Sequence, residues 1–170
     1  MSDEKKSADR AARGAKLTIE RTYQAQLEEL WALWTTKEGF ESWWGPQGFR
    51  VEVHALEARV NGTLQYDMIA DAPEQVAAMK QLGRPISHQT RGTFSEFKPH
   101  ERLALTHVID FLPEVEAYES TMTVQFFSLA KSVRMVVTLD PMHNEEFSKM
   151  SAEGFTSQLS KLDKRYGQNL

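Results

Sequence analysis

The spacing of apolar residues predicts a β-strand followed by two short helices at the start of the folded region. Residues 17–23 alternate between apolar and polar side chains, with a single arginine on the apolar side. This alternation is typical of a strand with one buried face. Apolar residues within 27–34 recur at the i, i+3, i+4, i+7 spacing of a one-faced helix. Thr36 is suited to cap a second short helix, and Gly45-Pro46 is expected to end it.

Further alternating stretches predict three pairs of antiparallel strands. The first pair, at 49–60 and 63–69, flanks Asn61-Gly62. This dipeptide is a strong signal for a two-residue type I′ hairpin, because both central residues of that turn need a positive φ. The other two pairs are expected at 87–97 with 102–110 and at 117–127 with 132–139.

Two more helices complete the predicted elements. Asp71 and Glu74 have the spacing of a capping box, Pro73 suits a first helical turn, and Gly83 is placed to end a short inserted helix near 71–83. A hairpin needs no connection of this length, so we expect the inserted helix to cover part of the fold, as a lid over any cavity. A long helical pattern from about Asn144 closes the chain.

This order of elements predicts an α+β protein with a helix-grip fold. We expect a strongly curved antiparallel sheet of about six to seven strands wrapped around one long C-terminal helix. A single domain is expected over 17–166, after a disordered polar tail at 1–16 and before a short tail at 167–170. Such a fold encloses space between sheet and helix, which favours a ligand cavity.

Composition narrows the classes of partner. The chain is 41% hydrophobic and 26% charged, with a net charge of −4, which is typical of a globular protein in water. An acidic chain without a basic patch argues against a nucleic-acid partner. No apolar run approaches the roughly 18–20 residues of a membrane span, and the N-terminal residues do not form a secretory signal. There is no cysteine, and we expect a cytoplasmic location without a membrane partner.

His107 and Tyr66 are the most suggestive polar residues. His107 shares the strand parity of its apolar neighbours and should face inward with them. There its imidazole could hydrogen-bond a ligand or act as an acid or base near neutral pH. The alternative is a core histidine satisfied by a backbone carbonyl. Tyr66 has the parity of Leu64 and Met68, and its hydroxyl needs a partner if it is buried.

The adjacent Trp43 and Trp44 cannot both point the same way, since neighbouring helical residues differ by about 100°. One ring is expected to pack in the core and the other to border the cavity. We favour Trp43 for the cavity, because it lies three residues after Phe40 on the apolar side of the helix.

The predicted ligand-binding set gathers inward-facing residues of the strands, the second helix and the last helix. No catalytic set, metal site, phosphate loop or dinucleotide motif is apparent, and no cofactor is expected. The predicted ligand-binding residues are Trp43, Tyr66, Met68, His88, Phe94, His107, Met122, Phe155 and Leu159.

Several segments in order carry a family resemblance. LTIERTY at 17–23, WWGPQGF at 43–49, RGTFSEFKPHERLALTH at 91–107 and EGFTSQLSKL at 153–162 together resemble the activator of heat-shock-protein-90 ATPase homologue-like family. That family lies in the START-like (SRPBCC, birch-pollen-allergen-like) superfamily. The resemblance covers about 17–166. Phe155 stands where relatives usually carry Trp, and the insertion at 71–83 resembles a subgroup of the family.

The resemblance implies three functions. The first is binding of a small apolar or amphipathic molecule in the cavity. The second is an enzyme of the cyclase or hydrolase kind, using His107 with Tyr66. The third is a stress-related interaction module with an exposed apolar patch that includes 111–113, and a homodimer is also compatible with the fold. The co-chaperone that names the family has a separate N-terminal domain, whereas only polar residues at 1–16 precede the fold here. A chaperone partner is therefore not expected.

Overall fold

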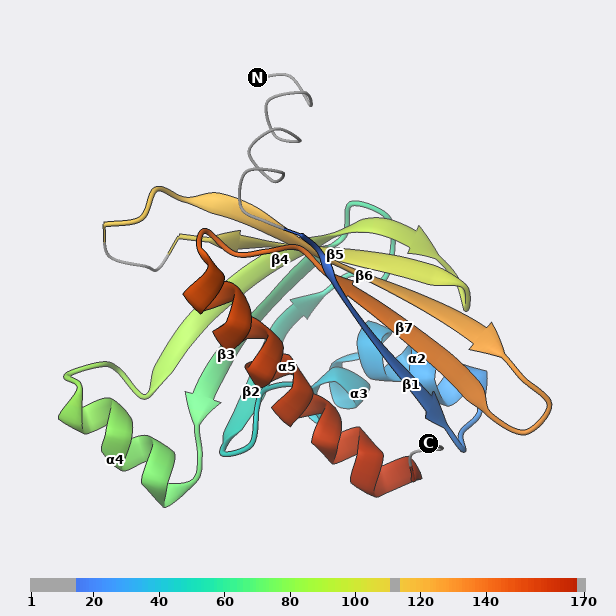
Figure 1. Ribbon diagram of the computed structural model, residues 1–170, viewed down its shortest axis with the longest axis horizontal. Helices are drawn as coiled ribbons and strands as arrows, with labels where there is room; N and C mark the ends of the chain where they lie inside the picture. Colours follow the sequence, from blue (N-terminus) through green and yellow to red (C-terminus); the bar gives the residue numbers. More distant parts are fainter. Residues whose placement is uncertain (1–14, 111–113, 168–170) are drawn as a thin grey trace.

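One curved antiparallel sheet and one long helix dominate the structure, a computed structural model that describes residues 15–110 and 114–167 (Figure 1). The seven strands are arranged in the order β1-β7-β6-β5-β4-β3-β2. This confirms the predicted helix-grip fold. The apolar patch expected at 111–113 lies outside the described residues. The elements are β1 (Leu17–Tyr23), α2 (Leu27–Thr35), α3 (Lys37–Glu41), β2 (Phe49–Leu56), β3 (Thr63–Ala70), α4 (Pro73–Gln81), β4 (Ser87–Lys98), β5 (Arg102–Ile109), β6 (Tyr118–Ser128), β7 (Val133–Leu139) and α5 (Glu145–Tyr166).

The register of the strands places one set of side chains on the concave face, toward α5. His107 of β5 is paired with Gly92 of β4 and with Ser120 of β6. Tyr66 of β3 is paired with Thr90 of β4. Because side chains alternate along a strand, these paired positions share one face of the sheet. The register therefore places His107 and Tyr66 on the inward-facing side of the sheet, as their positions along the strands predicted.

Side-chain caps begin two of the helices as their sequences indicate. The Thr36 hydroxyl accepts a hydrogen bond from the Gly39 backbone N–H at 3.0 Å, at the start of α3. The Asn144 side chain accepts one from the Phe147 N–H at 2.8 Å, at the start of α5. Each cap satisfies a backbone donor that the helix itself cannot pair.

The connection between β2 and β3 differs from the predicted two-residue turn, because it spans 57–62. Asn61 has a φ of 63°, but Gly62 is not among the residues with positive φ, and a type I′ turn requires both. The type I′ prediction is therefore wrong. A Cβ on Gly62 would lie 2.0 Å from the Glu57 carbonyl oxygen, so the glycine allows a close backbone approach. The loop also pairs with β4, through backbone hydrogen bonds of Asn61 and Gly62 to Phe94.

The inserted helix α4 begins without a capping box. Its N-cap is Ala72, which makes no side-chain cap hydrogen bond, so the cap predicted from Asp71 and Glu74 is wrong. Pro73 does occupy the first turn. Gly83 follows the helix with a φ of 68°, the left-handed conformation that commonly ends a helix.

The position of α4 also differs from expectation. Figure 1 shows α4 projecting beyond the ends of β3 and β4, and none of its side chains is buried. Leu82, directly after the helix, is 67% exposed. The backbone N–H groups of Asp71 and Ala72 donate to the Gly48 carbonyl at 2.8 and 3.1 Å. The helix is thus anchored at its start and does not cover the concave face.

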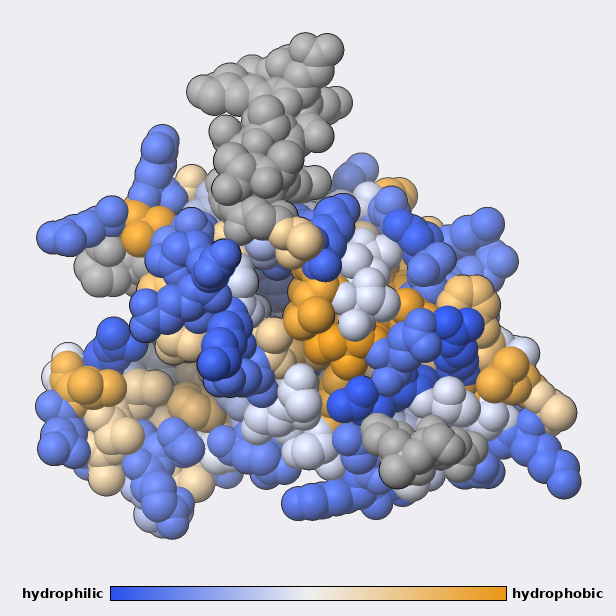
Figure 2. Space-filling model, viewed as in Figure 1, coloured by the Kyte–Doolittle hydropathy of each residue, from blue (hydrophilic) through white to orange (hydrophobic). Residues whose placement is uncertain are grey.

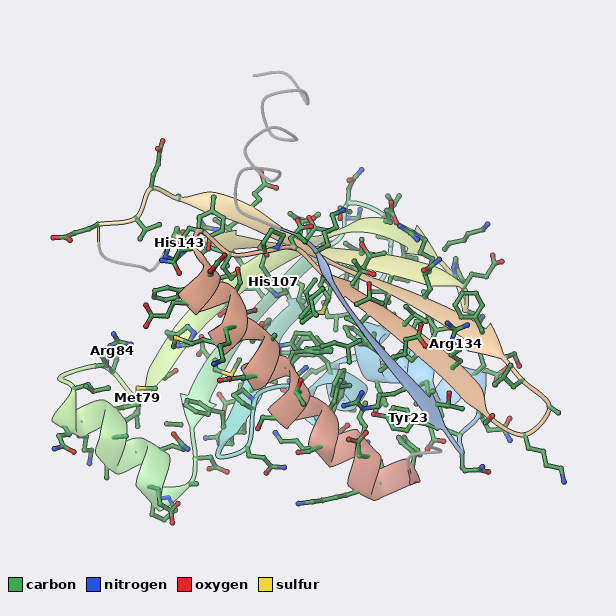
Figure 3. All side chains as sticks on the ribbon, in the orientation of Figure 1. Tyr23, Met79, Arg84, His107, Arg134 and His143 are labelled. Carbon is green, nitrogen blue, oxygen red and sulfur yellow. The ribbon has the colours of Figure 1, made fainter. Side chains whose placement is uncertain are left out.

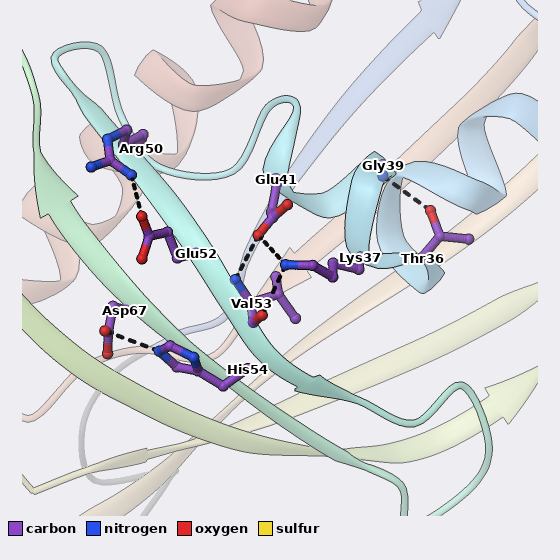
Figure 4. A network of polar contacts seen from close by, with 9 residues as sticks. All are labelled: Thr36, Lys37, Gly39, Glu41, Arg50, Glu52, Val53, His54 and Asp67. Carbon is purple, nitrogen blue, oxygen red and sulfur yellow. Dashed lines mark hydrogen bonds and ion pairs between the residues drawn. The ribbon is translucent and has the colours of Figure 1, made fainter.

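Polar side chains of α3 close the free edge of the sheet at β2. The Glu41 carboxylate accepts a hydrogen bond from the Val53 N–H at 2.8 Å, and the Lys37 ammonium donates to the Val53 carbonyl at 3.1 Å (Figure 4). The bonds from Lys37 and from Val53 lower the pKa of Glu41. The strand register shifts just after Val53. Side-chain pairing at this point satisfies an edge that could otherwise add another strand.

The C-terminal half of α5 is fixed to the turn that follows Trp44. The Gln158 side-chain oxygen accepts a hydrogen bond from the Gly45 N–H at 2.7 Å. The Lys161 ammonium donates to the carbonyls of Gly45 and Phe49 at 2.8 and 3.3 Å, and burial lowers its pKa. The turn between α3 and β2 is therefore the docking point for the long helix.

Candidate functional site

The two halves of α5 differ in how closely they meet the sheet. Phe155, at the middle of the helix, and Leu159 and Leu162 in its C-terminal half are buried. Since residues of a helix turn by about 100° each, Ser151 points within about 40° of Phe155, yet Ser151 is exposed. A Cβ built on Gly154 would meet no atom within 4 Å. Figure 2 shows the surface hollowed beside the N-terminal half of α5. The space between the sheet and the N-terminal half of α5 is therefore open.

Aromatic rings form the inner end of this space. Trp44 stacks on Phe40 with ring centres 4.4 Å apart and meets the edges of Trp34 at 5.4 Å and Phe155 at 6.4 Å. Such packing of rings makes a rigid, water-excluding floor. The floor separates the open part of the concave face from the solid core beneath the C-terminal half of α5.

The two adjacent tryptophans divide their roles in the opposite sense from the one favoured by the sequence. The indole N–H of Trp43 donates to the Leu33 carbonyl at 2.9 Å, and the ring is 0% exposed. The indole N–H of Trp44 donates to the Tyr66 hydroxyl at 2.9 Å. Trp44 also lies over His107, with ring centres 6.4 Å apart and planes 18° from parallel. Trp44, not Trp43, belongs to the concave-face cluster.

A polar trio of Trp44, Tyr66 and His107 lies on this floor. The Tyr66 hydroxyl is 3.2 Å from His107 Nε2, in addition to its bond from Trp44. Tyr66 is buried, whereas His107 keeps part of its surface open. Figure 3 shows His107 on the sheet behind the N-terminal half of α5. The strands β3 and β5 and the α3–β2 turn thus bring three polar side chains into one chain of hydrogen bonds.

Burial controls the protonation of His107 and Tyr66. It lowers the pKa of His107 to about 4, so the imidazole is neutral near pH 7. Burial also raises the pKa of Tyr66, although the hydrogen bonds from Trp44 and Thr90 oppose the shift. Both groups therefore keep their neutral forms over the physiological range. They are suited to hydrogen bonding more than to exchanging protons near neutral pH.

The residues predicted to bind ligand fall into three groups. Trp43, Phe94 and Leu159 are 0% exposed, so they touch no open space and form core beneath the site. Tyr66 and Phe155 are buried at the edge of the open region, with 3% and 6% of their surface exposed. The residues with accessible surface on the concave face are Met68, His88, His107 and Met122.

A second polar pair borders the open region and was not found from the sequence. The Tyr118 hydroxyl lies 3.0 Å from His143 Nδ1. His143, labelled in Figure 3, precedes α5 and its ring centre is 4.4 Å from that of Phe147. Tyr118 shares the strand parity of Met122, and this signal could have placed it on the concave face. No spacing in the sequence links it to His143.

The described part of the chain shows neither a metal-binding cluster nor a membrane-spanning helix. Within 15–110 and 114–167, no group of three His, Asp or Glu side chains is arranged to hold a metal ion. None of the helices over the same residues combines the length and hydropathy needed to cross a membrane. A groove of about 440 Å³ lies between the β1–α2 connection (24–27) and the β6–β7 hairpin (128–133). It contains none of the polar trio, and we do not regard it as the main site.

Comparison with solved structures supports the same architecture. A protein of Chromobacterium violaceum matches with a TM-score of 0.70 and 18% identity, covering 88% of this chain and 95% of its own. The AHSA1 protein of Silicibacter pomeroyi matches with a TM-score of 0.69 and 21% identity, covering 89% and 96%. A protein of Nitrosomonas europaea gives 0.67 and 17%, covering 88% and 92%. At these identities the likeness concerns the fold.

Comparison with sequences identifies the family. A search of curated proteins finds no match. The model of the family described as "Activator of Hsp90 ATPase homolog 1-like protein" matches residues 24–167. This span includes the turn after Trp44, the polar trio and all of α5. The chain therefore belongs to the activator of Hsp90 ATPase homolog 1-like family.

Proposed function

We propose that the protein binds a small, mainly apolar molecule in the space between the concave face of the sheet and the N-terminal half of α5. The observation that carries the proposal is the difference between the two halves of the helix. By helical spacing Ser151 lies on the same side of the helix as Phe155, yet Ser151 is exposed whereas Phe155 is buried. This difference supports a ligand space beside the N-terminal half of the helix.

The lining suits an apolar ligand with limited polarity. Met68 and Met122 are partly open on the concave face and pack against the core. Methionine side chains adapt to irregular apolar surfaces. His107 adds one polar contact at the inner end of the space. Ligand sites commonly combine a mainly apolar wall with a few placed polar groups.

The enzymatic alternative has one observation in its favour, because His107 and Tyr66 do converge, at 3.2 Å. Their protonation argues against it. A general base works best when its pKa lies near the working pH, and burial lowers the pKa of His107 to about 4. Burial raises the pKa of the Tyr66 hydroxyl above its ordinary value, so it does not lose its proton near neutral pH either. Binding, not proton transfer, is the function that these residues support better.

A fluorescence titration tests the proposal. We choose 6-propionyl-2-dimethylaminonaphthalene (prodan), a neutral naphthyl ketone whose emission shifts to shorter wavelength in apolar surroundings. Binding beside Trp44 should also quench the tryptophan emission and excite the dye by energy transfer. We expect a saturable titration with one site per chain. A linear, non-saturating response, or a response unchanged after unfolding in urea, would reject the cavity as a binding site.

A further inference from the structure

The hydrogen bond that Tyr66 accepts from Trp44 favours one tautomer of His107. An indole N–H can only donate, so Trp44 makes the Tyr66 hydroxyl an acceptor. The hydroxyl proton remains available for one donated bond, and His107 Nε2 lies at 3.2 Å. With the hydroxyl proton directed to His107, Nε2 is the unprotonated nitrogen. A neutral imidazole with a bare Nε2 carries its hydrogen on Nδ1.

The Nδ1–H of His107 has no acceptor within the described residues. The only hydrogen bond of this side chain there is the one at Nε2. Among those residues, the buried polar side-chain atoms without a partner are Arg21 Nε, Trp34 Nε1 and Gln158 Nε2. His107 Nδ1 is not one of these sealed atoms, so it must be reached from the open space. The trio therefore presents a single N–H donor toward the cavity.

The surroundings of His107 favour a neutral acceptor over an anionic one. Its paired neighbours across the sheet are Gly92 and Ser120, and Leu105 and Ile109 flank it along β5 on the same face. None of these carries a charge. An anion placed among such groups would lose its hydration without gaining a cation. A carbonyl oxygen would gain one hydrogen bond at a much smaller desolvation cost.

We propose that the bound molecule carries a neutral carbonyl group, and that His107 Nδ1–H donates a hydrogen bond to its oxygen. This inference rests on the proposed function, because it concerns the polar contact inside the same cavity. Trp44 and Tyr66 act as positioning residues. They do not touch the carbonyl, but they hold the imidazole in the tautomer that can donate to it.

Competition against prodan with three naphthalenes of similar size tests the inference. The probes are 2-acetylnaphthalene, 2-ethylnaphthalene and 2-naphthoate, which differ at one group only. We expect the ketone to bind about tenfold more tightly than the ethyl compound, as one well-placed hydrogen bond allows. We expect the carboxylate to bind least well at pH 7.5, because it must give up its hydration.

Variants of His107 distinguish the effect of its N–H donor from the effect of its side-chain size. In His107→Leu the preference for the ketone over the ethyl compound should disappear while both still bind. His107→Asn, whose amide can place an N–H near the position of Nδ1, should restore part of that preference. The matched control is His54→Leu on the exposed side of β2, which should leave all three affinities unchanged.

Nitrogen-15 NMR of the imidazoles checks the tautomer in the unmodified protein. The His107 signals, assigned by their loss in His107→Leu, should show a protonated Nδ1 and a bare Nε2 between pH 6 and 8. A proton on Nε2 would mean that the Tyr66 hydroxyl donates elsewhere, for example to Thr90, and would overturn the inference. Equal affinity for the ketone and the ethyl compound, or tightest binding of 2-naphthoate, would also overturn it. Failure of prodan and all three naphthalenes to bind would instead reject the cavity itself.

Discussion

The indole N–H of Trp44 donates a hydrogen bond to the Tyr66 hydroxyl over 2.9 Å, joining the α3–β2 turn to the third strand. Tyr66→Phe removes the acceptor and leaves a buried indole N–H without a partner. We expect the free energy of unfolding to fall by about 1–3 kcal/mol. Urea denaturation measures the change. Tyr166→Phe, at a partly exposed ring, is the control and should change stability by less than about 0.5 kcal/mol. A Tyr66→Phe variant as stable as the parent would show that the bond is not formed.

The partly buried imidazole of His107 should make stability depend on pH. Its pKa falls from the ordinary 6.5 to about 4 in the folded protein. Between these values the unfolded chain binds more protons, so the free energy of unfolding decreases as the pH is lowered from about 6.5 to about 4. This part of the stability is complete above about pH 6.5. The loss is about 3 kcal/mol at most, and less where water reaches the ring.

A comparison with His107→Phe isolates this contribution. Burial also lowers the pKa of His88, which acts in the same direction in both proteins. The difference between parent and variant should therefore grow below pH 6.5, with the parent losing more stability. Parallel curves from pH 4 to 8 would contradict a lowered pKa of His107 in the folded protein.

Gly154 reports on the space beside α5. A helical glycine costs about 0.5–1 kcal/mol relative to alanine, and a Cβ at Gly154 would meet no atom within 4 Å. Gly154→Ala should raise the free energy of unfolding by that amount. Gly39→Ala is the counterpart, since its Cβ would lie 2.2 Å from the Ala32 carbonyl oxygen, and it should destabilise the protein. Thermal melts compare the two. A lower melting temperature for Gly154→Ala would mean that this side of the helix is packed.

The side chain of Gln158 holds α5 on the turn after Trp44. Gln158→Leu leaves the Gly45 N–H, now bonded at 2.7 Å, without an acceptor in a buried position. We expect a loss of about 1–3 kcal/mol in urea denaturation. Gln47→Ala removes an exposed bond to Ser160 in the same region and should cost less than about 0.5 kcal/mol. Equal effects of the two variants would argue against this docking point.

Much of the fold was predictable because local patterns determine it. The alternation of apolar and polar residues predicted the strands, Thr36 caps α3 as expected, and α5 begins near Asn144 as the helical pattern predicted. The wrong predictions concern a turn and a helix cap whose conformations depend on backbone contacts from distant parts of the chain. The turn signal of Asn61-Gly62 was overridden by pairing of this loop with Phe94 of β4. Asp71 does not cap α4, whose start is held by the backbone carbonyl of Gly48.

The site was predictable in part, for similar reasons. Strand parity placed His107 and Tyr66 on one face, and the register brings them to 3.2 Å. Parity cannot say how near α5 comes to each residue, so Phe94 and Leu159 were expected to line a cavity although they form solid core. Helical spacing could not choose between Trp43 and Trp44. That choice depends on the Leu33 carbonyl, which takes the indole N–H of Trp43.

The measurement that tests the central claim most directly is the affinity for prodan in two variants of α5. Ser151→Phe adds a ring on the side that faces the open part of the sheet, and Glu153→Phe adds the same ring on the opposite side. Both positions are exposed, so neither change should unfold the protein. We expect Ser151→Phe to weaken prodan binding at least about tenfold and Glu153→Phe to leave it unchanged. Equal affinities in both variants and the parent would contradict a ligand site between α5 and the sheet.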